Sequence, residues 1–315
     1  MREHMKLSRC VLGAIVVLAL VVGLVQAESV EKDPKLSLSP EKVSLEPRAC
    51  DGIDLLEDRE RVLEPLPWEE DSRFKDVISE NNTPILMAKY HATFDNPFPE
   101  EMYNVELAAN RLAGTVVAPG EIFSQNQKLG PYTEARDYKE GPIYKGTQVA
   151  KACGGGVCKI ASLLYNVATL CNLGIVERYN HSMAVPYVPP GQDATVYYGV
   201  KDLRFINNSQ GPIIIWAGMV HNTLYIAIYG QSKPPKVTWQ HEILKRIEYW
   251  TIYRTNISLP EGAEKIVVSG QDGCLVRSWL TIEYEEGKVE EKYLGENWYN
   301  VLPQVIERGP KNDMQ

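Results

Sequence analysis

The sequence predicts an α+β protein, in which a domain of helices and antiparallel strands is followed by a small all-β module. Two observations support this fold class. Between residues 103 and 171 apolar side chains recur at helical spacing, whereas from residue 175 onward they form short runs separated by turns. After Gly230 the composition changes again, to alternating strands and turns that begin at Pro234 and Pro235.

The first residues have the composition of an export signal. Basic residues among the first nine precede an uncharged apolar run from Cys10 to Val25, which closes on a small residue, Ala27. The run is short for a membrane span, which needs about 20 residues. We expect residues 1–27 to be a signal peptide or an N-terminal anchor. The protein is then extracellular or in the cell envelope, and it contacts the membrane only through an uncleaved N-terminal segment.

Residues 28–80 are expected to form an acidic, proline-containing spacer. From Glu28 to Lys75 the chain has 14 acidic and 8 basic residues. Such a segment buries little apolar surface and repels itself, so we expect it to be extended. The formal charge of the whole chain is −8, and no cluster of Lys and Arg interrupts it. This balance argues against nucleic acid as a partner.

The next two parts are a domain over residues 81–231 and a β module over residues 236–312. In the domain, apolar periodicity predicts a helix from Tyr103 to Leu112 and a second from about Val157 to Cys171, which Gly174 follows as a stop signal. Strands are expected at Ile175–Tyr179, Met183–Val188, Ala194–Tyr198, Arg204–Ile206, Ile213–Trp216 and Leu224–Tyr229.

The strongest functional signal is a glycine triplet, residues 154–156, that leads into Cys158 and the second helix. Glycines allow positive φ and close backbone approach, and a cysteine on the first turn of a helix is favoured as thiolate. Activated nucleophiles are commonly placed in this way. Two alternatives remain open. Cys158 is a buried structural cysteine after a turn, or it forms a disulfide with Cys153.

Cysteine counting leaves the pairing in this protein open. Five cysteines remain after the leader is removed, and an odd number leaves at least one unpaired or bonded to another molecule. Cys158 is the candidate for the unpaired thiol. A metal site from Cys153, Cys158 and His181 lacks a fourth ligand, and the cysteine spacing is not that of a zinc knuckle. We therefore expect no metal and no cofactor.

Simple geometry brings a histidine to the cysteine. A helix over residues 157–171 is roughly 22 Å long, and seven extended residues from Ile175 to His181 span roughly 23 Å. A strand that returns along the helix thus places His181 at the level of Cys158. Treating residues 189–192 as a hairpin turn pairs His181 with Val200 and puts Asp202 on the same face.

Cys158, His181 and Asp202 are therefore expected to act as nucleophile, base and orienting acid. Asp193 is the alternative third member, although its place beside the turn suggests that it holds the turn. Asp202 has the alternative of an ion pair with Lys201 or Arg204. The order of cysteine, histidine and acid is similar to that in papain-like and transglutaminase-like thiol enzymes.

Several motifs in fixed order between Ile85 and Tyr229 resemble the VanW family. These motifs are Ala118–Ser124, Gly154–Cys158, Leu164–Asn166, Asn180–Ser182, Tyr187–Gly191 and Lys201–Phe205. The resemblance implies a bacterial cell-envelope protein. The family generally has a glutamine where this chain has Lys159, so a role of that glutamine as an oxyanion donor does not carry over. Around the cysteine, Gly154, Gly155, Gly156 and Lys159 are expected to contact the substrate.

The C-terminal module resembles a G-five domain from about Lys236 to Lys311. This resemblance implies binding to a wall polysaccharide that contains N-acetylglucosamine. Four of the six tryptophans lie here, and aromatic faces stack on sugars. We expect Trp250 and Trp279 to contact substrate. The alternative is that these rings pair across strands of a thin sheet.

Two functions follow from these expectations. The first is a cysteine-dependent amide hydrolase or transferase that acts on peptidoglycan. The second is a non-catalytic protein that binds cell-wall polysaccharide or serves as a scaffold, linked to envelope stress or glycopeptide resistance. Both share one expected partner, peptidoglycan or another wall polymer that contains N-acetylglucosamine.

Overall fold

The computed structural model describes residues 65–145 and 148–310. The expected signal segment, most of the expected spacer and Cys50 lie outside the described residues. Within the described part of the chain, no helix has the length and apolar composition needed to cross a membrane.

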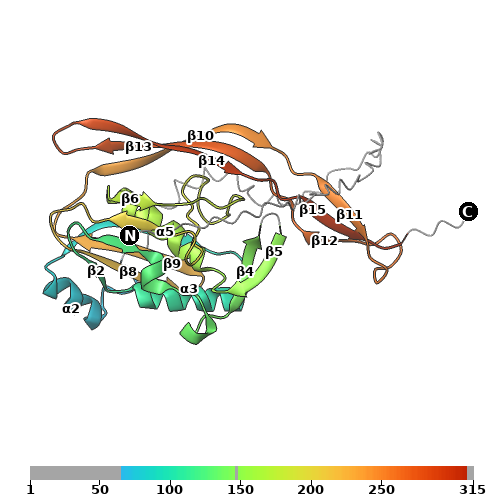
Figure 1. The fold of residues 1–315 in the computed structure, drawn as a ribbon, viewed down its shortest axis with the longest axis horizontal. Coiled ribbons are helices and arrows are strands. Elements are labelled where there is room, and N and C mark those ends of the chain that lie inside the picture. Colours follow the sequence, from blue (N-terminus) through green and yellow to red (C-terminus); the bar gives the residue numbers. More distant parts are fainter. Residues whose placement is uncertain (1–64, 146–147, 311–315) are drawn as a thin grey trace, which may run out of the picture. The chain divides into compact units, whose positions relative to one another are not determined.

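A four-stranded antiparallel sheet forms the centre of the first domain (Figure 1). Its strands, in spatial order, are β1 (Ile85–Thr93), β9 (Thr223–Gly230), β8 (Ile213–Val220) and β2 (Thr115–Val117). In β8, Ile213 and Ile215 join the main core, while Ile214 and Trp216 pack in a second core on the other face. Both faces are covered, so successive residues are apolar and the usual alternation disappears.

Two long helices cover one face of this sheet (Figure 1). Helix α3 spans Pro99–Leu112, with proline at its first turn, and helix α5 spans Val157–Leu170. These helices confirm both helical predictions. Most of α5 is buried because it contacts the central sheet and also strand β10 of the C-terminal module.

Residues 65–80 belong to the folded domain, which corrects the expected spacer boundary at residue 80. Helix α2 spans Ser72–Glu80, and Leu66, Trp68 and Phe74 are buried on the second face of the sheet. The Trp68 indole donates a hydrogen bond of 3.0 Å to the Tyr229 hydroxyl. This stretch is acidic on average, but it contains three large apolar residues. They pack on the second face of the sheet and shield it from solvent.

Short elements connect the sheet to α5. They are the sheet β3-β7-β6 (Ile122–Ser124, Arg204–Ile206, Gly174–Glu177), the hairpin β4-β5 (Glu140–Lys145, Gln148–Cys153) and the helices α4 (Gln125–Leu129) and η2 (Glu134–Arg136). Strand β5 ends at Cys153, immediately before the glycine turn into α5.

The strands predicted at Met183–Val188 and Ala194–Tyr198 do not form. Between Tyr179 and Leu203 the chain is irregular and contains one isolated bridge, Tyr197 to Lys201. The first run is nevertheless largely buried, and in the second only Ala194 and Val196 are buried, while Tyr197 and Tyr198 are exposed. The apolar pattern therefore indicated burial for the first run and part of the second, but it did not indicate the backbone pairing.

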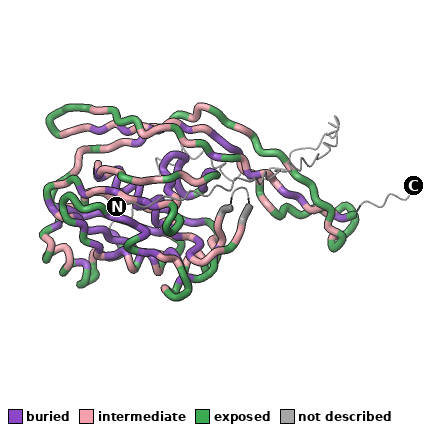
Figure 2. The backbone as a smooth tube through the Cα atoms, viewed as in Figure 1, coloured by how far each residue is buried: buried purple, intermediate pink, exposed green. Residues whose placement is uncertain are grey.

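The C-terminal module is all-β, as predicted. One sheet has the order β10-β13-β14 (Lys236–Ile247, Gly273–Glu283, Val289–Tyr299), and a smaller one has the order β11-β15-β12 (Thr251–Thr255, Gln304–Arg308, Glu264–Val268). Burial alternates along β13, and Leu280 and Ile282 join the main core. Figure 2 shows that buried residues are frequent around α3 and α5 and sparse in β11 and β12.

Candidate functional site: a cysteine at the start of α5

Cys158 is the second residue of α5, and the turn before it requires glycine. Gly156 has a φ of 103°, which side chains disfavour. A Cβ on Gly155 would lie 2.4 Å from the Gly141 carbonyl carbon. The turn thus holds Cys158 among the first N–H groups of the helix, which lack partners within the helix. This packing explains the glycines without a substrate contact.

A polar stripe on α5 holds the irregular segment 192–196. Cys158, Ser162 and Asn166 are spaced four residues apart, so they share one side of the helix. The Asn166 amide donates to the Gln192 carbonyl at 2.8 Å, and the Ser162 hydroxyl accepts from the Ala194 N–H at 3.0 Å.

The stripe ends at the sulfur. Cys158 Sγ lies 3.4 Å from the Val196 backbone nitrogen and 3.4 Å from Thr195 Oγ1. Four helical residues rise about 6 Å and two extended residues span about 6.6 Å, so alternate residues of the segment meet successive members of the stripe. The segment's backbone groups are paired with helix side chains, which is why it forms no strand.

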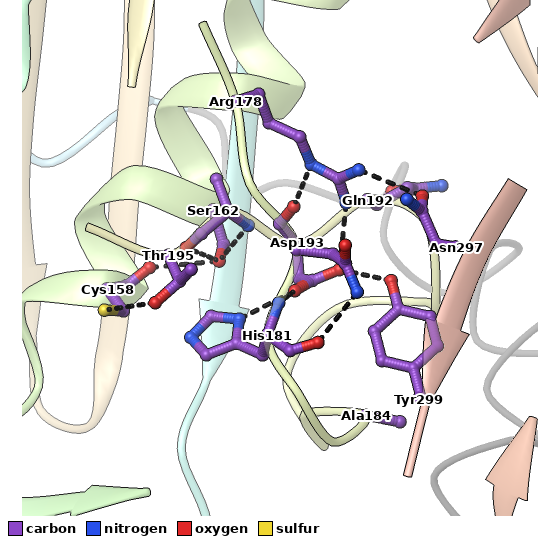
Figure 3. A network of polar contacts seen from close by, with 12 residues as sticks. Cys158, Ser162, Arg178, His181, Ala184, Gln192, Asp193, Thr195, Asn297 and Tyr299 are labelled. Carbon is purple, nitrogen blue, oxygen red and sulfur yellow. Dashed lines mark hydrogen bonds and ion pairs between the residues drawn. The ribbon is translucent and has the colours of Figure 1, made fainter. Parts of the chain in front are cut away.

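His181 is held between Cys158 and a carboxylate (Figure 3). Its Nδ1 lies 2.7 Å from Asp193 Oδ2, and its backbone N–H donates to the same oxygen at 2.6 Å. The second ring nitrogen lies on the side of Cys158, and the histidine lowers the pKa of the Cys158 thiol. The structure therefore brings together Cys158, His181 and Asp193.

Electrostatics in this cluster favour an ion pair between thiolate and imidazolium. Burial raises the pKa of the Cys158 thiol, but the hydrogen bond and positive charge of His181 outweigh it, so the pKa lies below its ordinary value. Burial lowers the pKa of His181, but the hydrogen bonds to Asp193 and Cys158 and their charges raise it to about 9. Each partner stabilises the charged form of the other.

Asp193 is a fully buried carboxylate with several donors. Its Oδ1 accepts from Arg178 at 3.0 Å and from the Tyr299 hydroxyl at 2.5 Å. Burial raises the pKa of Asp193, but the hydrogen bond and charge of His181, with Arg178 and Tyr299, hold it below its ordinary value. The site therefore has an acid behind the imidazole whose charged form its neighbours stabilise.

Asp202, the predicted third member, does not contact His181. Its carboxylate accepts from the Ser124 hydroxyl at 2.5 Å and from the Asn126 N–H at 2.9 Å, so it caps the start of α4. The prediction placed Asp202 by assuming a hairpin that does not form. Asp193, which sequence reasoning weighed as the alternative, occupies the place beside His181.

Lys159 lies in the wall of a cavity of about 430 Å³. Its ammonium pairs with Glu101, and it stands over the rings of Phe94, at 4.9 Å, and Tyr187, at 5.2 Å. The cavity is lined by residues 93–98 and by Glu101, Pro142, Ile143, Pro186 and Tyr187. The cavity is linked to the cysteine by Lys159, which lines the cavity and directly follows Cys158 in the sequence.

The two predicted tryptophans lie on the module, away from the buried side of its larger sheet. Trp250 is 55% exposed in the connection from β10 to β11. Trp279 alternates with the buried Ser278 and Leu280 on β13, so it faces outward, opposite Tyr293 of β14. Both rings are therefore reachable from solvent.

Cys153 and Cys158 do not form a disulfide with each other. Cys153, Cys158 and Cys171 carry free thiols. The Cys153 thiol donates to the Tyr138 carbonyl at 3.0 Å. In residues 65–145 and 148–310, no group of three or more His, Cys, Asp or Glu side chains is arranged to hold a metal ion.

Sequence reasoning missed four residues of the site: Ser162, Arg178, Thr195 and Tyr299. Ser162 had a usable signal, because a polar residue four positions after Cys158 interrupts an apolar helix. Tyr299 had none, since it lies 106 residues from Asp193 in the sequence. Its contribution depends on how the module docks.

The fold and the site define a class of protein: an α+β domain with a helix-borne Cys–His–Asp cluster, joined to a small β module. Residues 100–229 match the profile of the VanW family, described as VanW like protein, and residues 240–311 match that of the G5 domain. The chain thus contains a VanW-like domain and a C-terminal G5 domain, which confirms both resemblances found in the sequence.

Two curated proteins share the first domain. An uncharacterised protein, YoaR of Bacillus subtilis, is 38% identical over 146 residues, 46% of this chain and 48% of that protein. Vancomycin B-type resistance protein VanW of Enterococcus faecalis is 25% identical over 174 residues, 51% of this chain and 63% of that protein. The chain therefore spans about half the length of the first relative and less than two thirds of the second.

Two solved structures align with the module. The structure titled IgA1 Protease G5 domain structure covers 26% of this chain and 100% of its own, with a TM-score of 0.17 and 19% identity. The HP0197-G5 crystal structure covers 24% and 99%, with a TM-score of 0.14 and 20% identity.

Proposed function

We propose that this chain is a cell-envelope protein whose VanW-like domain is a cysteine-dependent amide hydrolase or transferase acting on peptidoglycan. The supporting observation is that His181 stands between Cys158 and Asp193, with its Nδ1 2.7 Å from Asp193 Oδ2 and the sulfur at the start of a helix. The expected export by residues 1–27 and the match to the VanW and G5 families support a place in the envelope.

In the first step the Cys158 thiolate attacks the carbonyl carbon of an amide. A C–S bond forms, and the carbonyl electron pair moves onto oxygen. The positive end of α5, where Cys158 lies, stabilises that oxyanion. The C–N bond then breaks as His181 Nε2 gives its proton to the departing nitrogen, which leaves a thioester on Cys158 and a neutral imidazole.

In the second step the neutral His181 removes a proton from the incoming nucleophile. Water gives hydrolysis, and an amine gives transfer. The nucleophile attacks the thioester carbon, the C–S bond breaks, and the thiolate and imidazolium are restored. Asp193 keeps the imidazole oriented and stabilises its positive charge in both steps, without itself changing protonation.

The substrate class follows from the surroundings of the cysteine. The adjoining cavity combines the aromatic rings of Phe94 and Tyr187 with the Lys159–Glu101 ion pair, so it offers apolar contact and both charges. A short peptide with charged groups, such as the stem peptide of peptidoglycan, has matching chemistry. We propose that this cavity binds the peptide beside the scissile amide.

The test is turnover of defined peptidoglycan fragments by the full chain. Muropeptides are incubated with the protein and with its Cys158→Ala variant, and products are followed by mass spectrometry. We expect cleavage or exchange of an amide bond and a thioester adduct on Cys158, both absent from the variant. If the unsubstituted protein leaves every muropeptide intact and forms no adduct, the enzymatic proposal fails.

A second candidate is a non-catalytic wall-binding or scaffold protein, and the outer face of the module favours it. Trp279, Tyr293 and Trp298 lie on this face, and Lys245 stands 5.8 Å from the Trp298 ring. Exposed aromatic rings on a sheet suit stacking on N-acetylglucosamine units.

Sedimentation with purified peptidoglycan tests the second candidate. We expect the unsubstituted chain to pellet and Trp279→Ala to remain largely soluble, while the matched variant Trp68→Phe, which changes a buried tryptophan of the other domain, keeps binding. Equal pelleting of Trp279→Ala and the unsubstituted chain contradicts a role for this face.

A further inference from the structure

Tyr299 belongs to the G5 domain, yet its hydroxyl lies in the thiol site of the VanW-like domain. It is the last residue of β14. Its hydroxyl donates to Asp193 Oδ1 at 2.5 Å (Figure 3). It also accepts from the Gly191 N–H at 2.7 Å. Tyr299 and Asp193 are both 0% exposed. Water therefore does not compete for this hydroxyl, and both of its hydrogen bonds serve the loop that carries Asp193.

A second residue of the same strand supports the same carboxylate. Asn297 Oδ1 accepts from Arg178 Nη1 at 2.9 Å, and Arg178 Nη2 donates to Asp193 Oδ1 at 3.0 Å. Residues two apart on a strand point to the same side, so Asn297 and Tyr299 reach one site. The G5 domain thus holds Asp193 directly through Tyr299 and indirectly through Arg178.

Backbone groups at the end of β14, and of the residue after it, hold the segment around His181. The Asn300 N–H donates to the Ser182 carbonyl at 2.7 Å, and the Trp298 carbonyl accepts from the Asn180 amide at 3.0 Å. These two bonds bracket His181 in the sequence. The end of β14 therefore touches the residues on both sides of the histidine as well as its acid.

We propose that the G5 domain supplies a positioning residue, Tyr299, whose hydroxyl holds the Asp193 carboxylate in the orientation that aims His181 at Cys158. A carboxylate rotates unless both oxygens are engaged. Oδ2 faces the histidine, and Tyr299 and Arg178 occupy Oδ1. Tyr299 acts through Asp193 and does not touch the reacting atoms. The inference rests on the proposed function of Cys158, and it makes the module part of the site as well as a wall-binding device.

The variant Tyr299→Phe tests this role, because it keeps the buried ring and removes only the hydroxyl. The matched control is Tyr253→Phe, a tyrosine of the same module, on β11, that is 50% exposed. The full chain is alkylated with iodoacetamide over a range of pH, and modification of Cys158 is measured by peptide mass spectrometry beside the melting temperature.

We expect Tyr299→Phe to slow Cys158 alkylation at pH 6.5 by about ten- to a hundredfold, the effect of losing one hydrogen bond to a charged group. The pH at which alkylation rises moves upward, and the protein still melts cooperatively. A role in packing alone changes the melting temperature and leaves this profile in place. Tyr253→Phe is expected to match the unsubstituted protein.

The possible outcomes separate this inference from the proposed function. Coinciding profiles for Tyr299→Phe and the unsubstituted protein overturn the positioning role. An ordinary thiol profile for Cys158 in the unsubstituted protein overturns the proposed function instead. If Tyr299→Phe does not fold, Asn297→Ala takes its place. An upward shift of its profile supports the inference, and an unchanged profile overturns it.

Discussion

Cys153 and Cys158 lie on the two sides of one glycine turn, and the structure gives them opposite properties. Both are half-buried free thiols. Burial and the charges of Glu134 and Glu140 raise the pKa of Cys153, whereas His181 brings the pKa of Cys158 below its ordinary value. The difference shows that exposure does not decide reactivity here. Cys153 ends a strand among carboxylates, and Cys158 begins a helix beside an imidazolium.

The largest expected effect is the loss of the reactive thiol itself. In the full chain at pH 6.5, Cys158→Ala is expected to abolish rapid alkylation by iodoacetamide, because thiols with a pKa of about 8.5 are only about 1% thiolate at that pH. Cys153→Ala, the matched control from the same turn, is expected to keep the full rapid phase. Peptide mass spectrometry gives the site of modification. Rapid labelling that disappears with Cys153→Ala would reverse the comparison.

The next effect separates the two candidate acids. Asp193→Asn removes the charge that orients and stabilises the His181 imidazolium, so we expect a loss of turnover by a factor on the order of 10²–10⁴. Asp202→Asn alters only the cap of α4 and is expected to keep turnover within a few-fold. Rates on a muropeptide substrate and the melting temperature are measured for both. A larger loss for Asp202→Asn than for Asp193→Asn would favour Asp202 as the orienting acid, as the sequence predicted.

The contrast between Asp193 and Asp202 also shows how much of the site could be predicted from the sequence. The glycine triplet and the helix length were enough to place Cys158 on the first turn and His181 within its reach. The acid was placed wrongly because the apolar runs at 183–188 and 194–198 resemble strands. In the structure the segment 192–196 instead bonds to the polar stripe of α5, and no local pattern distinguishes this arrangement from a strand.

The fold was predictable to a similar depth. Helices α3 and α5 and the strands β8 and β9 have strong apolar patterns, so the sequence identified them. Residues 65–80 were assigned to the spacer because acidic composition outweighs three apolar residues in any local average. Tyr299 depends on the docking of one domain on another, which is a property of two distant surfaces and leaves no mark in either segment.

The pH dependence of alkylation should also distinguish Cys158 from Cys153. Alkylation of Cys158 is expected to stay fast below the ordinary thiol range, while that of Cys153 falls, since only the first thiol has a lowered pKa. Turnover is expected to fall above about pH 9, where the His181 imidazolium loses the proton that the leaving nitrogen needs. Parallel profiles for the two cysteines would contradict the ion pair.

The stability of the folded protein should also depend on the protonation of His181. The pKa of His181 is about 9 in the folded protein against an ordinary 6.5, so the folded state binds this proton more tightly. Its contribution to stability is complete below pH 6.5 and is lost as the pH rises through about 9. We expect His181→Gln to flatten that part of the melting-temperature profile. An equally steep decline in this variant would assign the dependence to other groups.

The smallest expected effect concerns the stripe that carries Cys158 but not Cys153. Ser162 bonds both the N–H and the carbonyl of Ala194, at 3.0 and 3.1 Å. Ser162→Ala leaves the buried N–H without its partner, which costs about 1–3 kcal/mol in the free energy of unfolding. The exposed helical residue Ser79 gives the control Ser79→Ala, expected to change it by less than about 0.5 kcal/mol.

Urea unfolding of both serine variants measures that free energy, and alkylation then shows whether the stripe also tunes the thiol. The segment 192–196 carries both the Thr195 hydroxyl and the Val196 N–H that bond the sulfur. A looser segment therefore weakens two of the interactions that lower the pKa of Cys158 and none of those around Cys153. We expect Cys158 to react more slowly in Ser162→Ala while Cys153 is unchanged. Equal slowing of both thiols would mean that the glycine turn, rather than the stripe, links them to the helix.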